Sequence, residues 1–314
     1  MTADRPLLGI LLMTGFCILA PLGDSLSKIV IAEHALILII TARFIVQPVL
    51  LTPILWAQGG GFAMPRRALW LTALRTVLHI IGIACMVLSL RYLPLADAIA
   101  IAFVMPFLML ILGNLVLGEE VGPRRLAACA VGFVGTLLVV QPSFAEVGAP
   151  ALLPLVVAVA FSLFMLVTRI MAKDTGAIQL QAVSGAMATV VLVPLLLLFD
   201  GSGLRDLDAD MPDGRTFALL LGLGIIGTVG HLMMTWSLRF APAATLAPMQ
   251  YLEIPFATAI GFALFGDLPN GLAAAGIAIT VASGLYIVAR ERSLSRVPTP
   301  PAPAPQPKGM TGEG

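Results

Sequence analysis

The chain has 314 residues, of which 59% are hydrophobic and 11% are charged, and its mean hydropathy is +1.01. A water-soluble domain is about half apolar and about a quarter charged, so this composition predicts a protein embedded in a membrane. The net charge of +1 gives no basic field that could hold nucleic acid, and we expect no nucleic-acid partner.

Apolar runs long enough to cross a bilayer occur along most of the chain. A helix needs about 20 residues to cross a hydrocarbon core of roughly 30 Å, and ten runs approach this length between polar breaks. The first run exceeds the apolar part of a signal peptide and lacks a convincing cleavage site, so we expect it to be retained. We predict an all-α integral membrane protein with ten transmembrane helices, at 7–28, 35–56, 68–90, 95–118, 124–141, 150–172, 178–199, 216–238, 244–266 and 270–289.

The distribution of Lys and Arg predicts the orientation of these spans. If both termini are cytoplasmic, twelve of the eighteen basic residues fall in inner loops and tails, four fall in outer loops, and Arg43 and Arg75 lie within spans. Positive residues favour the cytoplasmic side, so we expect both termini inside and the loop 200–215 outside. Residues 291–314 are basic and then Pro-rich, which predicts a disordered cytoplasmic tail.

The two halves of the chain repeat one pattern. Arg91–Pro94 recurs as Arg239–Pro242, and the same offset of 148 residues pairs Glu119 with Asp267. Each unit has five spans, and because five is odd the second unit is inverted relative to the first. Inverted repeats recur in secondary transporters, where they provide two states open to opposite sides; a duplication without a transport role is the alternative. The predicted units cover residues 1–142 and 150–290.

Spaced motifs give the chain a resemblance to a known family. The motifs are Tyr92–Ala98, Pro106, Leu117–Glu119, Gly132–Gly135 and Val139–Pro142, with Gly266-Asp267 in the second half. With them the chain resembles the EamA-type transporters of the drug/metabolite transporter superfamily over about residues 7–290. The resemblance implies a multi-pass carrier of the bacterial inner (plasma) membrane, built from two inverted five-helix repeats around a central cavity. It leaves the substrate open, since similar proteins are linked to amino acids, nucleotide-like cofactors, riboflavin or acylcarnitine-type compounds.

The expected function is secondary active transport of a small polar or zwitterionic metabolite by alternating access, with proton coupling and exchange both left open. The metabolite would be amino-acid-like, cofactor-like or vitamin-like, and the lipid bilayer is the other partner. A membrane-embedded enzyme and a non-transporting membrane protein are the alternatives. The three histidines are scattered, and neither His-Glu-x-x-His nor a phosphate-binding Gly-Lys-Ser/Thr loop occurs. We therefore expect no enzyme activity, no cofactor and no bound metal, and the oligomeric state, monomer or homodimer, stays open.

Polar side chains inside the spans are the candidates for the substrate site, because a charge at a helix centre costs about 2.5–3.5 kcal/mol. Arg43 lies too deep to reach the outer headgroups comfortably, so it either binds an anion or pairs with Asp24. Arg75 either lines the site or extends toward the cytoplasmic interface. His79 lies near the midplane, where it binds, exchanges a proton or bonds a neighbouring helix. The predicted substrate-binding set is Arg43, Gln47, Arg75, His79, Gln250 and Tyr251.

Three of the intramembrane groups are candidates for coupling or proton exchange: Glu253, Asp24 and His79. An acid near the midplane, such as Glu253, can be held protonated unless it pairs with an arginine. For Asp24 the alternative is a local ion pair with Lys28, four residues further along the same helical face. The cations Lys28, Arg43 and Arg75 balance the anions Asp24, Asp97 and Glu253, which favours a zwitterionic or neutral polar substrate.

Prolines mark the places where spans should be kinked. Interrupted helices in corresponding places of two repeats are the best sequence indication of a carrier site. The predicted hinges are Pro106 in the first half and Pro248 and Pro255 in the second.

Overall fold

In the computed structural model, residues 5–119, 121–267 and 271–294 are described, and every secondary-structure element among them is helical. Seven helical stretches are long and apolar enough to cross a membrane, and the shorter apolar helices are Leu126–Leu138, Met249–Phe265 and Ala274–Ser283. The elements are α1 (Pro6–Ile31), α2 (Leu36–Ala57), α3 (Arg66–Ser89), α4 (Leu95–Ala102), α5 (Met105–Leu117), α6 (Pro123–Val147), η1 (Ala149–Leu152), α7 (Leu153–Met171), α8 (Ala177–Leu198), α9 (Gly214–Phe240), α10 (Ala243–Leu246), η2 (Ala247–Leu252), α11 (Glu253–Phe265) and α12 (Gly271–Leu294). Of the expected tail, 291–294 belong to α12, and 295–314 lie outside the described residues.

Two helical regions are interrupted, one in each half of the chain. The first breaks between α4 and α5, where Pro106 occupies the first turn of α5. The second changes to the 3₁₀ segment η2, which contains Pro248, before α11 begins with Pro255 in its first turn. Proline lacks a backbone N–H and clashes with the preceding turn, which accounts for both breaks. The expected interruptions are therefore present, while their movement as hinges stays a prediction.

Both interrupted regions end in the same way. Gly118 follows α5 with φ +62°, and Gly266 follows α11 with φ +72°. A residue in this left-handed conformation terminates a helix, and glycine adopts it without a steric penalty. An acid, Glu119 or Asp267, comes directly after each of these glycines.

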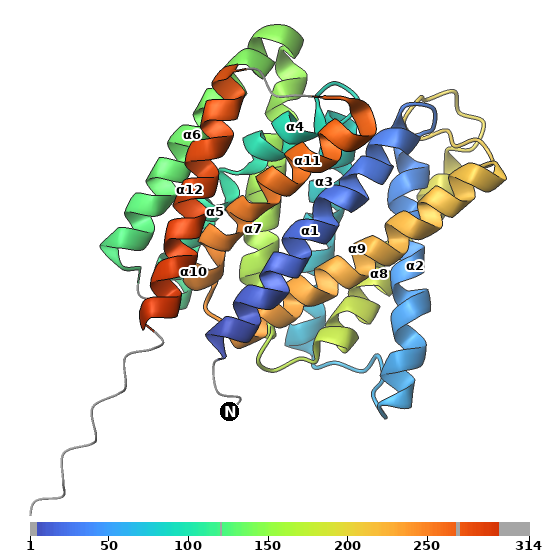
Figure 1. Cartoon of the computed structure of the whole chain (residues 1–314). Helices are drawn as coiled ribbons and strands as arrows, with labels where there is room; N and C mark the ends of the chain where they lie inside the picture. Colours follow the sequence, from blue (N-terminus) through green and yellow to red (C-terminus); the bar gives the residue numbers. More distant parts are fainter. Residues whose placement is uncertain (1–4, 120, 268–270, 295–314) are drawn as a thin grey trace, which may run out of the picture.

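The closest helix pairings join the first half of the chain to the second. Figure 1 shows α1 beside α9 and α6 beside α12, and α2 packs on α8 and α3 on α7 in the same manner. Small residues permit this proximity: a Cβ atom on Gly135 of α6 would lie 2.7 Å from the carbonyl oxygen of Gly276 on α12. The interior between the halves is filled by buried apolar side chains.

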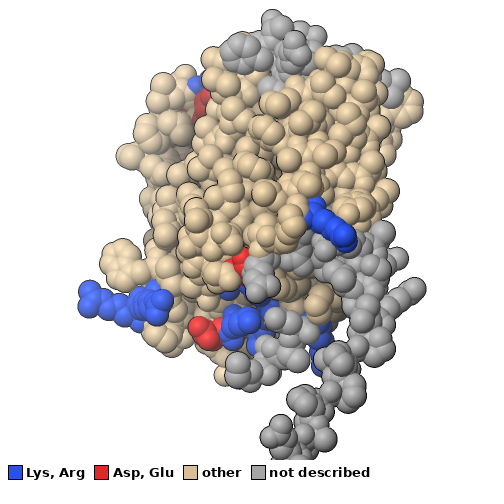
Figure 2. Space-filling view, turned by 90° about the vertical axis from the view of Figure 1, so that its left-hand side faces the viewer, with Lys and Arg blue, Asp and Glu red and all other residues tan. Residues whose placement is uncertain are grey.

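The outer surface of the bundle is apolar over most of its height. In Figure 2 uncharged residues cover a broad area, and most of the visible Lys and Arg lie in the lower half of the molecule. Figure 1 places the described start of α1 at this same lower end. Exposed Leu, Val and Ile side chains at many positions of α2, α6 and α8 suit contact with lipid, which solvates apolar groups without cost.

Candidate functional site

A cavity of about 70 Å³ lies between α1, α2, α3, α7, α9 and the two interrupted helices. Phe103 and Met105 line it at the break between α4 and α5, and Glu253 lines it where η2 passes into α11. Both interruptions therefore face one space. Its polar lining consists of Asp24, Arg43, His231 and Glu253, and its apolar lining of Phe16, Ala20, Ile83, Met86, Ile99, Ala102, Phe103, Met105, Val157 and Phe161.

The polar lining combines two acidic and two basic side chains. Asp24 comes from α1, Arg43 from α2, His231 from α9 and Glu253 from α11, so four helices from both halves contribute. Among the described residues no ion pair joins Glu253 to Arg43. The lining offers donors and acceptors of both charges, which suits a ligand that carries polar groups of both kinds.

The side chains of Arg43, His231 and His79 contact one another in a row that leads from the cavity into the protein. Its Nη2 lies 3.0 Å from Nε2 of His231, and Nε2 of His79 lies 3.3 Å from the same atom. The imidazole of His79 is enclosed by the rings of Phe44, Phe161 and Phe164. His79 thus lies behind His231 rather than on the cavity wall, so the neighbouring-helix bond that the sequence left open is present.

Arg75 is fully buried and does not extend to the cytoplasmic interface. Its Nε donates to the hydroxyl of Thr168 across 2.7 Å, and its guanidinium lies 4.2 Å from the centre of the Phe164 ring. The Nη1 atom has no hydrogen-bond partner within the described chain. A buried cation held by hydroxyl groups and an aromatic face is expensive, which gives Arg75 a structural or binding role rather than an incidental position.

Gln47 joins α2 to α8 by hydrogen bonds. Its amide nitrogen donates to the carbonyl and to the side-chain oxygen of Gln181, at 2.6 and 3.0 Å. The amide of Gln181 in turn donates to the hydroxyl of Thr235 across 2.9 Å. Together with Arg75, which also reaches the hydroxyl of Thr235, these residues form a polar layer. Gln181 and Thr235 were not among the predicted site residues, because an uncharged side chain in an apolar span gives little signal in the sequence.

Gln250 and Tyr251 lie outside the cavity lining, in η2. The amide nitrogen of Gln250 approaches the sulfur of Met165 at 3.4 Å, and its Oε1 is buried without a partner among the described residues. The hydroxyl of Tyr251 donates to the carbonyl of Cys129 across 3.4 Å, and its ring packs on Phe103. These contacts place both side chains in the packing behind the helix break.

The ion pair that the sequence left open between Asp24 and Lys28 is not formed. Lys28 Nζ lies 3.2 Å from Oδ2 of Asp267 and 3.2 Å from the carbonyl oxygen of Leu93. Asp24 instead faces the cavity together with Arg43. Asp97 occupies the first turn of α4, where the helix dipole stabilises a carboxylate.

No group of three or more His, Cys, Asp or Glu residues in the described parts of the chain is arranged to hold a metal ion. A helical bundle that spans a membrane several times, with a mixed-charge cavity between its two halves, is the architecture of a membrane carrier.

Residues 7–141 and 149–289 of the chain each match the sequence pattern of the EamA-like transporter family. The chain belongs to this family and is a small-metabolite transporter, which confirms the resemblance seen in the sequence motifs.

Several proteins named as transporters are similar to this chain over most of their length. A riboflavin transporter of Rhizobium johnstonii is 31% identical over 76% of each chain. A pseudopaline exporter of Pseudomonas aeruginosa is 25% identical over 76% of this chain and 79% of its own. An S-adenosylmethionine uptake transporter of Rickettsia felis is 22% identical over 80% and 82%. A crystal structure at 19% identity shares the fold, with a TM-score of 0.67 over 92% of this chain and 98% of the other.

Proposed function

We propose that this chain moves a small polar or zwitterionic metabolite through the cavity between Asp24, Arg43, His231 and Glu253 by alternating access. The single observation that carries the proposal is that both interrupted helices and both signs of charge meet in one cavity. Broken helices present free backbone groups at membrane depth, and such positions bind the substrate in carriers built from inverted repeats.

The proposed architecture is ten transmembrane helices in two inverted repeats, with units at 1–142 and 150–290. The helix pairings between the halves support it. The first span of the first half, α1, packs on the third span of the second half, α9, and the first span of the second half, α7, packs on the third span of the first half, α3. The proposed orientation places both termini in the cytoplasm of a bacterium, across its inner membrane. The gathering of Lys and Arg near the end where α1 begins supports that orientation.

Transport requires the cavity to change size. A volume of about 70 Å³ holds a few water molecules, whereas pockets for drug-sized ligands measure about 300–1,000 Å³. Admission of a vitamin-like or cofactor-like compound therefore needs the helices around the cavity to separate. Such a separation is what alternating access supplies.

Riboflavin is the first compound to test, because relatives from Rhizobium johnstonii, Brucella anthropi and Vibrio cholerae are named riboflavin transporters. Counterflow in proteoliposomes should compare riboflavin with S-adenosylmethionine, amino acids and methylated amines. We expect saturable exchange of one class, lost in Arg43→Gln and kept in Arg205→Gln, whose side chain is exposed in an outer loop. Equal exchange by both variants would contradict the role of the cavity, and no exchange of any compound would contradict the proposed substrate class.

A further inference from the structure

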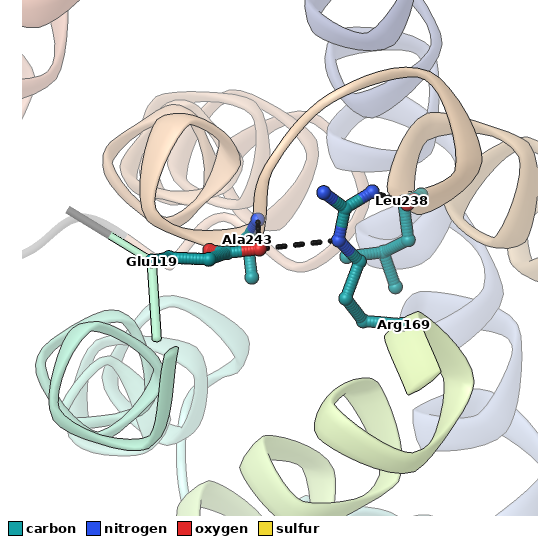
Figure 3. A network of polar contacts seen from close by, with 4 residues as sticks. All are labelled: Glu119, Arg169, Leu238 and Ala243. Carbon is teal, nitrogen blue, oxygen red and sulfur yellow. Dashed lines mark hydrogen bonds and ion pairs between the residues drawn. The ribbon is translucent and has the colours of Figure 1, made fainter. Parts of the chain in front are cut away.

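An ion pair with additional hydrogen bonds joins several helices at one end of the bundle. Arg169, in the last turn of α7, lies with its Nε 3.1 Å from Oε1 of Glu119, just after α5. Figure 3 shows that this carboxylate also receives the backbone N–H of Ala243, at 3.2 Å, while the guanidinium of Arg169 turns to the carbonyl of Leu238. We call these four residues the Arg169 cluster, and they join α5, α7, α9 and α10.

A second cluster has the same construction. Lys28, in the last turn of α1, pairs with Asp267, which follows α11. Its ammonium group also donates to the carbonyl of Leu93, in the link between α3 and α4, and lies 4.9 Å from the centre of the Phe265 ring. We call these residues the Lys28 cluster.

The internal repeat relates the two clusters to each other. Each base lies at the end of the first helix of its half, and each acid follows the interrupted helix of the opposite half. Glu119 and Asp267 are the acids that the 148-residue offset pairs. Each base also holds a carbonyl near the end of the third span of its own half, Leu93 for Lys28 and Leu238 for Arg169.

The clusters lie at opposite ends of the bundle, on either side of the cavity. The N–H of Arg5, before α1, donates to the carbonyl of Phe240, close to Leu238 in the Arg169 cluster. From Pro6 the helix α1 rises 1.5 Å per residue and reaches Lys28 after about 33 Å, roughly the thickness of a hydrocarbon core. Ala20 and Asp24, which line the cavity, lie between these ends of α1.

We infer that the Lys28 cluster and the Arg169 cluster are the outer and inner gates of the carrier, and that they break in alternation; the inference rests on the proposed alternating access. Each ion pair bridges the two halves, so separation of the halves at one end must break the pair at that end. Both pairs are formed at the same time, one on each side of the cavity. An ion pair suits this task because water entering an opened vestibule solvates the released charges.

The two gates are unequal in the structure. The side chains of Arg169 and Glu119 are 9% and 12% exposed, whereas those of Lys28 and Asp267 are 19% and 36% exposed. Glu119 also bonds the start of α10. Solvent weakens an exposed pair more than a buried one, so the inner gate holds more firmly than the outer gate.

Thiol labelling of the cavity tests this inference without any substrate. Ala20→Cys in a background lacking Cys17, Cys85 and Cys129 gives one thiol on the cavity wall. An impermeant reagent applied to right-side-out and inside-out vesicles then measures access from each face. We expect Glu119→Gln to raise labelling from the inner face about fivefold or more and to lower it from the outer face, and Asp267→Asn to do the reverse.

The matched control is Asp208→Asn, because the Asp208 carboxylate accepts the backbone N–H groups of Gly201 and Gly203 within its own loop of the second half. It should leave both labelling rates unchanged. The exchange variant Arg169→Glu with Glu119→Arg should return the inner rate toward that of the parent. If Glu119→Gln does not reach the membrane, Glu119→Asp shortens the acid while keeping its charge and should act in the same direction.

Two results would overturn the inference: Glu119→Gln and Asp267→Asn acting on the same face, or both matching Asp208→Asn. Because labelling needs no substrate, a failure to find a transported compound would leave the gates in place. Conversely, saturable transport with unaltered labelling in both variants would reject the gates and keep the proposed function.

Discussion

The guanidinium of Arg43 on α2 lies 3.0 Å from Nε2 of His231 on α9. Arginine only donates hydrogen bonds, so Nε2 of His231 must accept, and the proton of this neutral imidazole lies on Nδ1. Nε2 of His79 lies 3.3 Å from the same nitrogen, so an N–H on this atom would share the single lone pair of His231 Nε2 with Arg43. The Nδ1 atoms of both rings are buried without a hydrogen-bond partner in the described chain, so each ring keeps one unsatisfied polar atom.

This geometry predicts different effects for two substitutions of His231. His231→Leu removes the acceptor and leaves the buried guanidinium of Arg43 unpaired, which should lower stability by about 1–3 kcal/mol and weaken substrate binding. His231→Gln keeps an acceptor oxygen and should lose less of both. Thermal unfolding in detergent and a binding isotherm measure the two effects. Equal losses of stability and binding in both variants would show that His231 does not act through its hydrogen bond to Arg43.

A close approach on α9 predicts a defect in binding that does not come from unfolding. A Cβ atom on Gly227 would lie 2.9 Å from Nε of Arg43, so Gly227→Ala should displace the flexible guanidinium and raise the apparent Kd by about tenfold, which corresponds to 1.4 kcal/mol. Gly222→Ala is the control on the same helix, because its nearest neighbour would be 3.7 Å away. Similar affinities of the two variants would show that the Arg43 guanidinium does not contribute to substrate binding.

Glu253 is the first of the three candidates for proton coupling to test. It is 7% exposed and lines the cavity, and no ion pair within the described residues joins it to Arg43 or Arg75. We expect Glu253→Gln to keep substrate exchange while losing the response of uptake to an imposed pH gradient. A normal gradient response in a well-expressed variant would redirect the search to Asp24 and His79, and lost folding or binding would indicate a structural anion.

The orientation of the chain can be read from two loops. Ser202 lies exposed between α8 and α9, and Asp174 lies exposed between α7 and α8. In the proposed topology one helix separates these loops, so Ser202→Cys should react with an impermeant thiol reagent from outside and Asp174→Cys from inside. Labelling of both from one face would contradict the number of spans between them.

Asp213 caps the beginning of α9, and we expect this part of the fold to lose stability when the pH falls far enough to protonate the Asp213 carboxylate. Its Oδ1 accepts the backbone N–H of Thr216 across 2.7 Å, and this hydrogen bond holds the pKa of the Asp213 carboxyl below its usual range. A carboxyl with a lowered pKa in the folded state stabilises the fold above its unfolded pKa, about 3.9, and this contribution is lost as the pH falls through the folded pKa. The amide of Thr216 should exchange its hydrogen faster below that pH.

Two substitutions separate the charge of Asp213 from its capping bond. Asp213→Asn keeps a capping oxygen and should remove the acid-dependent step in the exchange of the Thr216 amide. Asp213→Ala should speed that exchange at every pH. An unchanged step in Asp213→Asn would assign it to another group near the start of α9.

Periodic features of the chain determined the helices and the membrane class. The apolar runs predicted the positions of α1, α2 and α3 to within a few residues, because a bilayer imposes one length and one polarity on every span. Pro106 and Pro248 similarly predicted where helices break, since proline acts on its own backbone. The repeated acids Glu119 and Asp267 were visible as a pair in the sequence.

Which polar groups meet was decided only by the tertiary structure. Lys28 is four residues from Asp24, yet it pairs with Asp267, which follows α11 in the other half of the chain. Arg43 likewise bonds His231, 188 residues away, and Arg75 bonds Thr168. Sequence spacing constrains partners along one helix, whereas contacts between helices depend on how each helix is rotated and where the halves pack together. That packing is set by side chains throughout both halves, so the members of the cavity and of the two gates became apparent only in three dimensions.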